Sequence, residues 1–228
     1  MSVVLAFDVY GTLINTQGVT ETLRHHVGEQ AADFARIWRD KQLEYSFRRG
    51  LMRCYQPFSV CIAQSFDYTA SLLGMNFTSS VREKLLQAYR TLPAFADARM
   101  GLRQAEAAGM RRFAFSNGAA DAVEGLLQHA GIRQSFEGVV SVNDLGTFKP
   151  NPDVYDYFLR CSGGEADNSW LISGNPFDVI GALQAGMKAA WVKRSPAAVF
   201  DPWGIEPTLV VESLAGLVEA IKACSPQA

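Results

Sequence analysis

Apolar residues recur along the chain in short runs that are rich in β-branched and aromatic side chains. We predict that these runs are strands, at residues 3–9, 111–116, 138–142, 169–173, 189–192 and 208–211. After residue 98 the runs alternate with segments of helical periodicity, at residues 121–131, 153–161 and 177–187. Near-continuous apolar strands separated by helices predict parallel βαβ units whose sheet is covered on both faces.

The segment between the first and second strands departs from this alternation. Residues 16–97 contain no convincing strand pattern, and helical periodicity extends over residues 29–51, 58–74 and 79–89. The pattern therefore predicts an α/β fold with an open, mainly parallel sheet and a helical cap inserted after the first strand. Residues 1–15 and 98–228 would form the core domain, and residues 16–97 the cap domain.

Polar side chains follow four of the predicted strands, where open α/β sheets bind their ligands. They are Asp8 and Thr12, then Ser116 and Asn117, then Lys149, and finally Ser173, Asn175 and Asp178. Each residue alone has a structural explanation, such as a turn, a helix cap or a solvated loop. Their order on this topology instead predicts an active site with two carboxylates and a lysine.

Composition and charge narrow the classes of function. The chain has 228 residues, of which 48% are hydrophobic, and this length allows one core plus a smaller inserted unit. A net charge of −2 and the lack of a basic run predict no nucleic-acid partner. No apolar stretch approaches the ~20 residues that a membrane span needs, so we expect no membrane partner and a cytoplasmic protein. The four cysteines form no CxxC pair and predict free thiols.

Five segments carry a resemblance to a known family. They are FDVYGTL at 7–13, WRDKQLEYSFRRGL at 38–51, FSNG at 115–118, FKPNPDVY at 148–155 and SGNPFDVIGA at 173–182. In this order over the whole chain they resemble the type II L-2-haloacid dehalogenases of the haloacid dehalogenase (HAD) superfamily. The resemblance implies a Rossmann-like HAD core and hydrolysis of L-2-haloalkanoic acids to D-2-hydroxy acids and halide. It also implies a homodimer that needs no metal or cofactor.

The resemblance assigns the reacting groups. Asp8 would attack C2 of the 2-haloalkanoate and form an ester, and water would then attack the ester carbonyl carbon. Lys149 and Asp178 would orient Asp8 and assist the water, while Arg39 from the cap would receive the halide. Thr12, Ser173 and Asn175 would hold the carboxylate and the water by hydrogen bonds.

The resemblance also implies a substrate pocket. Asn117 and Phe58 would complete the halide site, and Ser116 would bind the substrate carboxylate with backbone N–H groups at the following helix start. Tyr10 and Tyr155 would shape the pocket, with Tyr155 near the lysine. Leu43 and Phe177 complete the expected substrate-binding set.

The tyrosine at position 10 favours halide displacement on chemical grounds. Related phosphatases carry a second aspartate two residues after the nucleophile, which protonates a leaving alkoxide. A halide is a very weak base and needs no proton, so Tyr10 is harmless for its departure. Asn175 also stands where an acid might be expected, which weakens the affinity for a hard dication.

Three alternatives stay open at this point. They are a Mg²⁺-dependent HAD phosphatase, a relative that uses Asp8 on a non-halogenated substrate such as a strained-ring amino acid, and a non-catalytic binding protein. Phe177 stands where some relatives have Trp, Gly174 where some have Ser, and Arg48 where some have an apolar residue. These departures leave the substrate range open.

Overall fold

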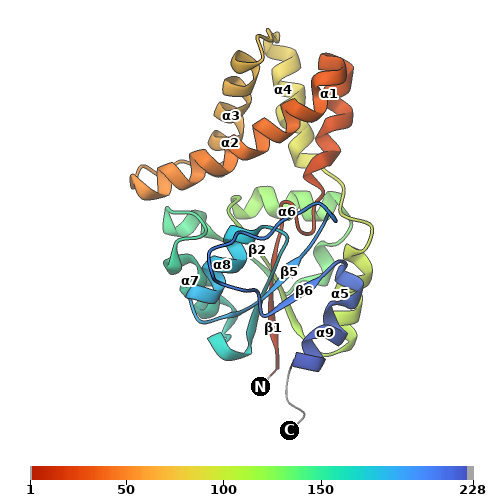
Figure 1. Cartoon of the computed structure of the whole chain (residues 1–228), viewed down its shortest axis with the longest axis vertical. Coiled ribbons are helices and arrows are strands. Elements are labelled where there is room, and N and C mark those ends of the chain that lie inside the picture. The colour runs from red at the N-terminus through yellow and green to blue at the C-terminus, as the bar shows by residue number, and fades with distance from the viewer. Residues whose placement is uncertain (1, 225–228) are drawn as a thin grey trace.

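A six-stranded parallel sheet forms the centre of the molecule, of which the computed structural model describes residues 2–224 (Figure 1). The strands are β1 (Val4–Asp8), β2 (Arg111–Ser116), β3 (Gly138–Ser141), β4 (Ser169–Ser173), β5 (Lys188–Val192) and β6 (Leu209–Val211). Their order across the sheet is β3-β2-β1-β4-β5-β6, and every neighbouring pair is parallel. The predicted open α/β fold is thereby confirmed.

Helices cover both faces of this sheet. They are α5 (Ala98–Ala107), α6 (Ala120–His129), α7 (Pro152–Ser162), α8 (Pro176–Gln184) and α9 (Leu217–Cys224). The helices α5 and α6 lie on one face, where α9 packs against α5, and α7 and α8 pack together on the other. The central strands, with helices on both faces, are buried along their length, which explains their nearly continuous apolar sequence.

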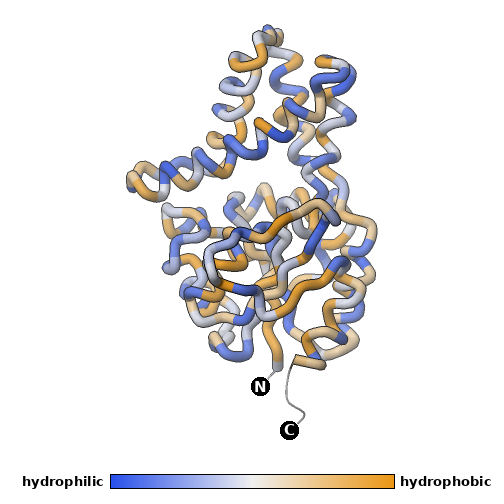
Figure 2. Tube along the Cα trace, viewed as in Figure 1, coloured by the Kyte–Doolittle hydropathy of each residue, from blue (hydrophilic) through white to orange (hydrophobic). Residues whose placement is uncertain are grey.

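Four further helices form a separate layer beyond the carboxyl ends of the strands (Figure 1). They are α1 (Val19–Val27), α2 (Ala31–Leu51), α3 (Phe58–Leu72) and α4 (Ser79–Ala88). In Figure 2 these helices alternate between hydrophilic and hydrophobic stretches, as expected of helices with one buried face. We refer to residues 16–93 as the helical layer.

Aromatic side chains hold the helical layer together. The Phe66 ring lies 5.2 Å from that of Phe34 and 5.1 Å from that of Trp38, measured between centroids. Trp38 also donates a hydrogen bond of 2.8 Å from its indole nitrogen to the backbone oxygen of Ile62. Because this cluster joins α2 to α3, the layer packs around a core of its own.

The two connections between the sheet and the helical layer run side by side. Asn15 donates a backbone hydrogen bond of 2.8 Å to Pro93, and Phe95 donates one of 2.9 Å to Leu13. Ile14 forms an antiparallel bridge with Ala94. The chain therefore leaves the sheet and returns to it at one place.

Short 3-10 turns complete the described chain, at Thr16–Gly18, Gly28–Gln30, Tyr89–Thr91, Arg133–Ser135, Val142–Leu145, Ala166–Asn168 and Leu214–Gly216. All four cysteines are free, as the sequence predicts. Within residues 2–224, no helix is both long enough and apolar enough to cross a membrane.

Candidate active site

Asp8 ends the central strand β1, and its carboxylate is the point on which the neighbouring strand ends converge. The residue is 7% exposed. Its Oδ2 accepts hydrogen bonds from Thr12 Oγ1 at 2.7 Å, Asn175 Nδ2 at 2.8 Å and Ser173 Oγ at 3.3 Å. Gly11, at a φ of +83°, allows the tight turn that returns Thr12 to Asp8. Three predicted site residues from two strand ends thus donate to one oxygen of Asp8.

Lys149 neutralises the buried carboxylates. Its Nζ lies 3.2 Å from Asp8 Oδ1 and 2.9 Å from Asp178 Oδ2, and it donates a third hydrogen bond of 2.9 Å to the backbone oxygen of Phe115. All three ammonium protons have an acceptor, and the residue is 1% exposed. One buried cation thus bridges the two carboxylates of the site.

Asp178 lies in the first turn of α8, which begins at Pro176. Its Oδ1 accepts a hydrogen bond of 2.8 Å from the Tyr155 hydroxyl. Complete burial raises the pKa of Asp178 above its ordinary value, and the charge of Asp8 adds to the rise, while Lys149 opposes it.

Tyr155 lies near the lysine, as the resemblance implies. Its side chain is fully buried, and its hydroxyl donates a hydrogen bond to Asp178, which also binds Lys149. Burial raises the pKa of the Tyr155 hydroxyl well above its ordinary value, so it stays a proton donor in this bond. A Cβ on Gly181 would lie 2.3 Å from this hydroxyl, so glycine there leaves room for Tyr155. Tyr155 therefore positions Asp178.

The loop after β4 packs closely against the turn that follows β1. Thr12 Oγ1 accepts a hydrogen bond of 2.8 Å from the Gly174 amide, and Asn175 Nδ2 donates a second bond, of 3.0 Å, to the Tyr10 backbone oxygen. A Cβ on Gly174 would lie 2.5 Å from the Gly11 oxygen. The glycine at position 174 is thus matched to a close backbone approach.

Ser116 and Asn117 lie at the end of β2 and are nearly buried. Ser116 Oγ accepts a hydrogen bond of 3.1 Å from the Gly118 amide, which leaves its own hydroxyl proton to donate. Asn117 Oδ1 accepts one of 3.0 Å from the Lys149 amide. Its Nδ2 makes no hydrogen bond within the part of the chain that the structure describes.

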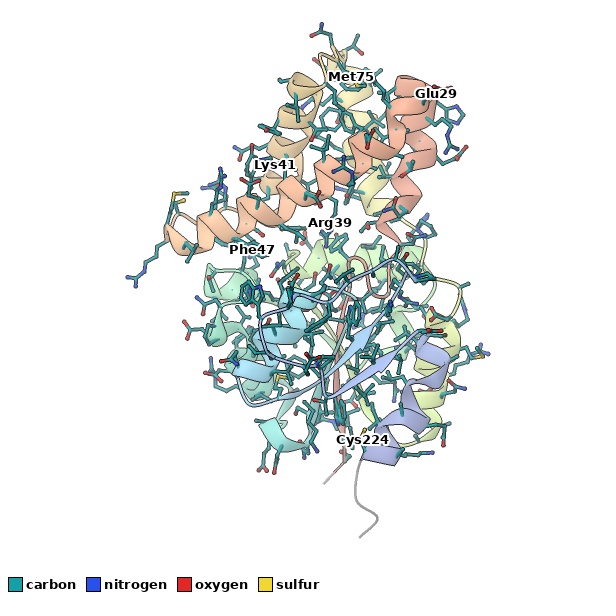
Figure 3. All side chains as sticks on the ribbon, viewed as in Figure 1. Glu29, Arg39, Lys41, Phe47, Met75 and Cys224 are labelled. Atoms are coloured by element: carbon teal, nitrogen blue, oxygen red, sulfur yellow. The ribbon has the colours of Figure 1, made fainter. Side chains whose placement is uncertain are left out.

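Arg39 is the charged group that the helical layer brings over the sheet edge (Figure 3). Its side chain extends from α2. One guanidinium nitrogen lies 3.4 Å from the Tyr10 backbone oxygen, and another lies 3.5 Å from Gln42 Oε1. Both contacts are long for charge-assisted hydrogen bonds. The guanidinium is therefore placed near the turn after Asp8 without being tightly held.

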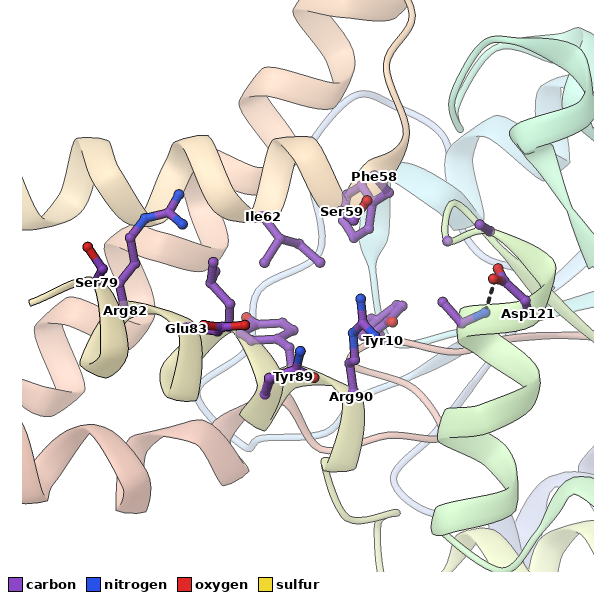
Figure 4. A pocket seen from close by; sticks show the side chains of 15 residues that line it. Tyr10, Phe58, Ser59, Ile62, Ser79, Arg82, Glu83, Tyr89, Arg90 and Asp121 are labelled. Atoms are coloured by element: carbon purple, nitrogen blue, oxygen red, sulfur yellow. Dashed lines mark hydrogen bonds between the residues drawn. The ribbon is translucent and has the colours of Figure 1, made fainter.

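Aromatic side chains surround this region. The Tyr10 ring lies 6.0 Å from that of Phe58 and 6.5 Å from that of Tyr89. Burial raises the pKa of the Tyr10 hydroxyl to about 12, with a further contribution from Tyr89, so the phenol stays neutral at physiological pH. Tyr10 and Phe58 both line a cavity of about 630 Å³ (Figure 4).

Two further predicted residues lie where the helical layer faces the body of the protein. The Phe177 ring packs against Phe47 of α2 with a centroid distance of 5.0 Å. Leu43 is half-buried on α2, one turn after Arg39, and thus on the same side of that helix. The phenylalanine at position 177 therefore links α8 to the helical layer.

Sequence reasoning missed two pairs of residues that support the site. Gln42 is fully buried next to Arg39, and its Nε2 donates a hydrogen bond of 2.9 Å to the Tyr89 hydroxyl. The three-residue spacing from Arg39 was the available signal for Gln42.

The second missed pair is Arg194 and Asp97. Arg194 donates hydrogen bonds of 2.5 and 3.2 Å to the Thr12 backbone oxygen, and bonds of 2.7 and 2.9 Å to the two carboxylate oxygens of Asp97. Its guanidinium also lies 4.1 Å from the centroid of the Phe95 ring. Arg194 thus fastens the turn after Asp8 to the connection that returns from the helical layer.

The comparisons with known proteins agree with this geometry. The family model for haloacid dehalogenase-like hydrolases matches residues 3–186. An (S)-2-haloacid dehalogenase from Xanthobacter autotrophicus is 36% identical over 190 residues, which cover 83% of this chain and 74% of the relative. Another, from Pseudomonas putida, is 31% identical over 211 residues, which cover 92% of each chain. The chain belongs to the (S)-2-haloacid dehalogenase family. The resemblance read from the five motifs is confirmed.

A solved structure from this (S)-2-haloacid dehalogenase family superimposes closely. It is the L-2-haloacid dehalogenase of Xanthobacter autotrophicus with chloropropionic acid covalently bound, with a TM-score of 0.92 and 29% identity. The match covers 99% of this chain and 100% of that one. Within residues 2–224, no group of three or more His, Cys, Asp or Glu side chains is placed to hold a metal ion.

For a member of the (S)-2-haloacid dehalogenase family, the two oxygens of Asp8 differ in a useful way. Oδ2 accepts three hydrogen bonds, whereas the one hydrogen bond that Oδ1 accepts from the described residues comes from Lys149. Oδ1 therefore keeps a lone pair for bond formation while Oδ2 fixes the orientation of the carboxylate.

Proposed function

We propose that this chain hydrolyses L-2-haloalkanoic acids to D-2-hydroxy acids and halide through an ester on Asp8. The observation that carries the proposal is the buried ion pair between Asp8 and Lys149. The residue two positions after Asp8, Tyr10, is not an acid. A carboxylate nucleophile without a second acid two residues after it suits a leaving group that needs no proton.

In the first step, Asp8 Oδ1 attacks C2 on the side opposite the halogen. The carbon–oxygen bond forms as the carbon–halogen bond breaks, and the configuration at C2 inverts. The halide leaves with its electron pair toward the Arg39 guanidinium and the free amide nitrogen of Asn117. Arg39 supports this role because its present contacts, at 3.4 and 3.5 Å, are long enough to yield to an anion.

In the second step, water attacks the carbonyl carbon of the Asp8 ester, so C2 keeps its inverted configuration. Asp178 accepts a proton from the water, a role that the raised pKa of its carboxyl supports. Ser173, Asn175 and Thr12 hold the carboxylate and the water. The departing alkoxide takes this proton from Asp178 and leaves as a D-2-hydroxy acid. The second proton of the water is released to solvent, so Asp8 is regenerated as a carboxylate without a metal or cofactor.

The remaining predicted residues receive binding roles in this proposal. The Ser116 hydroxyl donates to the substrate carboxylate, a role that its unused proton supports. Phe58 and Tyr10 contact the substrate from one side, and Leu43 and Phe177 close the space beneath α2. Residues 16–97 act as a cap domain over a core domain of residues 1–15 and 98–228.

We further propose a cytoplasmic homodimer. The helical layer exposes apolar side chains near one another in sequence, with Leu51 87% exposed and Met52 64% exposed. A second copy of this chain covering that end of α2 would remove this surface from water. Light scattering on the protein and on a Leu51→Glu variant tests the proposal, because a dimer that becomes a monomer in the variant is the expected result.

The decisive test of the reaction uses separate L- and D-2-chloropropionate in buffer with EDTA. Chloride release from the L-form alone is expected. A single turnover in ¹⁸O-labelled water should place the label in Asp8 and leave the first product unlabelled. Label that appears first in the product would overturn the ester route, and phosphate-ester hydrolysis that requires Mg²⁺ would support a phosphatase instead.

A further inference from the structure

The cavity next to Tyr10 is larger than a short haloacid needs. It has a volume of about 630 Å³ and lies between α3, α4 and the start of α6 (Figure 4). Pockets of this size hold ligands much larger than a three-carbon acid. Since Tyr10 and Phe58, two residues of the proposed substrate site, both line this cavity, the carbon chain of a bound 2-halo acid would extend into it.

The wall of the cavity combines apolar and charged side chains. Its large apolar side chains include Phe58, Ile62 and Leu86. An apolar wall favours added methylene groups, each of which improves binding about fourfold when it leaves water. Charged side chains lie along the rim of the cavity, and these are Arg82, Glu83, Arg90 and Asp121.

Two of the four charged groups of the rim are paired, and Arg90 is the unpaired cation. Arg82 is bound by Asp67 through two hydrogen bonds of 2.6 and 2.7 Å, and Asp121 accepts a bond of 2.8 Å from the Ala122 amide. Arg90 is exposed, and it makes no hydrogen bond or ion pair with any residue from 2 to 224.

The side chain of Arg90 extends beside Tyr10, whereas Glu83 lies beyond Tyr89 in the direction of Arg82 (Figure 4). The positive charge of Arg90 is felt at Tyr10, where it opposes the rise in the pKa of the phenol that burial causes. The unpaired cation of the rim therefore lies next to Tyr10, and the unpaired anion, Glu83, lies farther from Tyr10.

We propose that the cavity binds the chain of a 2-halo acid longer than propionate, and that Arg90 binds a second carboxylate on that chain. The inference rests on the proposed function and names its substrate class as 2-halodicarboxylic acids. Arg90 is then a specificity residue, since a planar guanidinium pairs with a carboxylate through two hydrogen bonds.

The test compares L-2-chloropropionate, L-2-chlorohexanoate and L-2-chloroadipate, the last two of equal carbon number. Arg90→Gln should lower kcat/KM for the adipate about tenfold, mainly through KM, and leave the other two substrates unchanged. Arg82→Gln is the matched control, because it removes the same charge from the same cavity and should change none of the three.

Three outcomes overturn the proposal. The first is an equal loss of L-2-chloroadipate turnover in the Arg90→Gln and Arg82→Gln variants. The second is a kcat/KM of the unaltered protein for L-2-chloroadipate that is no higher than for L-2-chlorohexanoate. The third is a kcat/KM for L-2-chlorohexanoate that is lower than for L-2-chloropropionate. Failure of all three substrates would instead contradict the proposed function. Calorimetric binding of D-2-hydroxyadipate to the protein and to Arg90→Gln then decides the cavity proposal without turnover, because equal affinity for the two proteins overturns it.

Discussion

The two sides of the active site hold their charged groups in different ways. On the sheet side, Lys149 makes three hydrogen bonds of 2.9 to 3.2 Å and is 1% exposed. On the side of the helical layer, Arg39 makes two contacts of 3.4 and 3.5 Å. The sheet side is therefore organised before a ligand arrives, whereas the helical side keeps cations that can form new contacts around it.

This difference follows from how each side is anchored. Parallel strands fix the register of Asp8 against Phe115 of β2, and the adjoining strand β4 ends at Ser173. The helical layer instead has a core of its own and joins the sheet through one pair of connections. A ligand can thus change the position of Arg39 without disturbing the hydrogen bonds of Asp8.

The largest effect is expected when Lys149 loses its charge. Lys149→Met leaves the carboxylates of Asp8 and Asp178 buried side by side, and it should lower the free energy of unfolding by about 3–5 kcal/mol and abolish halide release. Urea unfolding and chloride release measure the two effects. Adding Asp178→Asn should restore part of the stability and none of the activity. A loss of only a few tenths of a kcal/mol of unfolding free energy would contradict the comparison, because it would show that the sheet side holds its charged groups no more firmly than the helical layer does.

A smaller effect, confined to activity, is expected on the helical side. Arg39→Gln removes the cation that meets the developing halide, so kcat should fall about 10²- to 10³-fold. The free energy of unfolding should change by less than about 1 kcal/mol, because the contacts that are lost are long and partly exposed. Arg36→Gln on the exposed face of the same helix is the control and should leave kcat unchanged. Marked destabilisation by Arg39→Gln would contradict the conclusion that the helical side holds its charged group less firmly than the sheet side.

The third prediction concerns Arg194, which joins the turn after Asp8 to the connection that returns from the helical layer. Arg194→Gln breaks the pair with Asp97 and should cost about 2–3 kcal/mol of unfolding free energy. Burial alone would raise the pKa of Asp97, but hydrogen bonds from Arg194, Leu214 and Ser213 lower it below its ordinary value.

The pH dependence of that cost follows from the lowered pKa. The ionised Asp97 contributes stability above its unfolded pKa of about 4, and this contribution is lost as the pH falls through the lower folded value. The difference between the protein and Arg194→Gln in urea unfolding should therefore shrink in acid. Lys222→Gln, in an exposed pair with Glu219, should show no such difference at any pH. If the difference in unfolding free energy between the protein and Arg194→Gln is the same at every pH, the pair with Asp97 is not the source of that difference.

The smallest effect is expected at Tyr155. Tyr155→Phe removes the hydrogen bond to Asp178 and should reduce kcat about tenfold. Because that bond lowers the pKa of Asp178, its loss raises the pKa further, and the acid limb of the kcat profile should move to higher pH. Tyr157→Phe, whose hydroxyl bonds to Asp144 instead, should leave the profile unchanged. If the acid limb of the kcat profile does not move in Tyr155→Phe, Asp178 is not the group that accepts the proton from the water.

The strands could be predicted from the sequence almost residue by residue. The run at 169–173 is β4 as observed, and the run at 138–142 exceeds β3 by one residue. Burial on both faces makes such strands apolar along their length, which is a strong local signal. The helix α1 was missed because Val19 and Leu23 are its only buried residues, so its sequence is mostly polar.

The site could be predicted as far as strand ends dictate it. Asp8, Ser173 and Asn175 meet because parallel strands bring their carboxyl ends to one edge. The bond from Arg194 to Thr12 joins positions 182 residues apart, and that from Tyr155 to Asp178 depends on how α7 packs against α8. Neither has a local signal. The catalytic roles of these residues stay predictions until the variants are measured.

The paired connections at Leu13–Asn15 and Pro93–Phe95 have a consequence for how this protein can diversify. A segment whose two ends meet at a single hydrogen-bonded base behaves as a cassette, because removing or exchanging it leaves the order of the remaining strands intact. Genetic exchange of the whole helical segment would deliver a new set of substrate contacts in one event. The strand ends that carry Asp8 and Lys149 would be inherited unchanged beneath it.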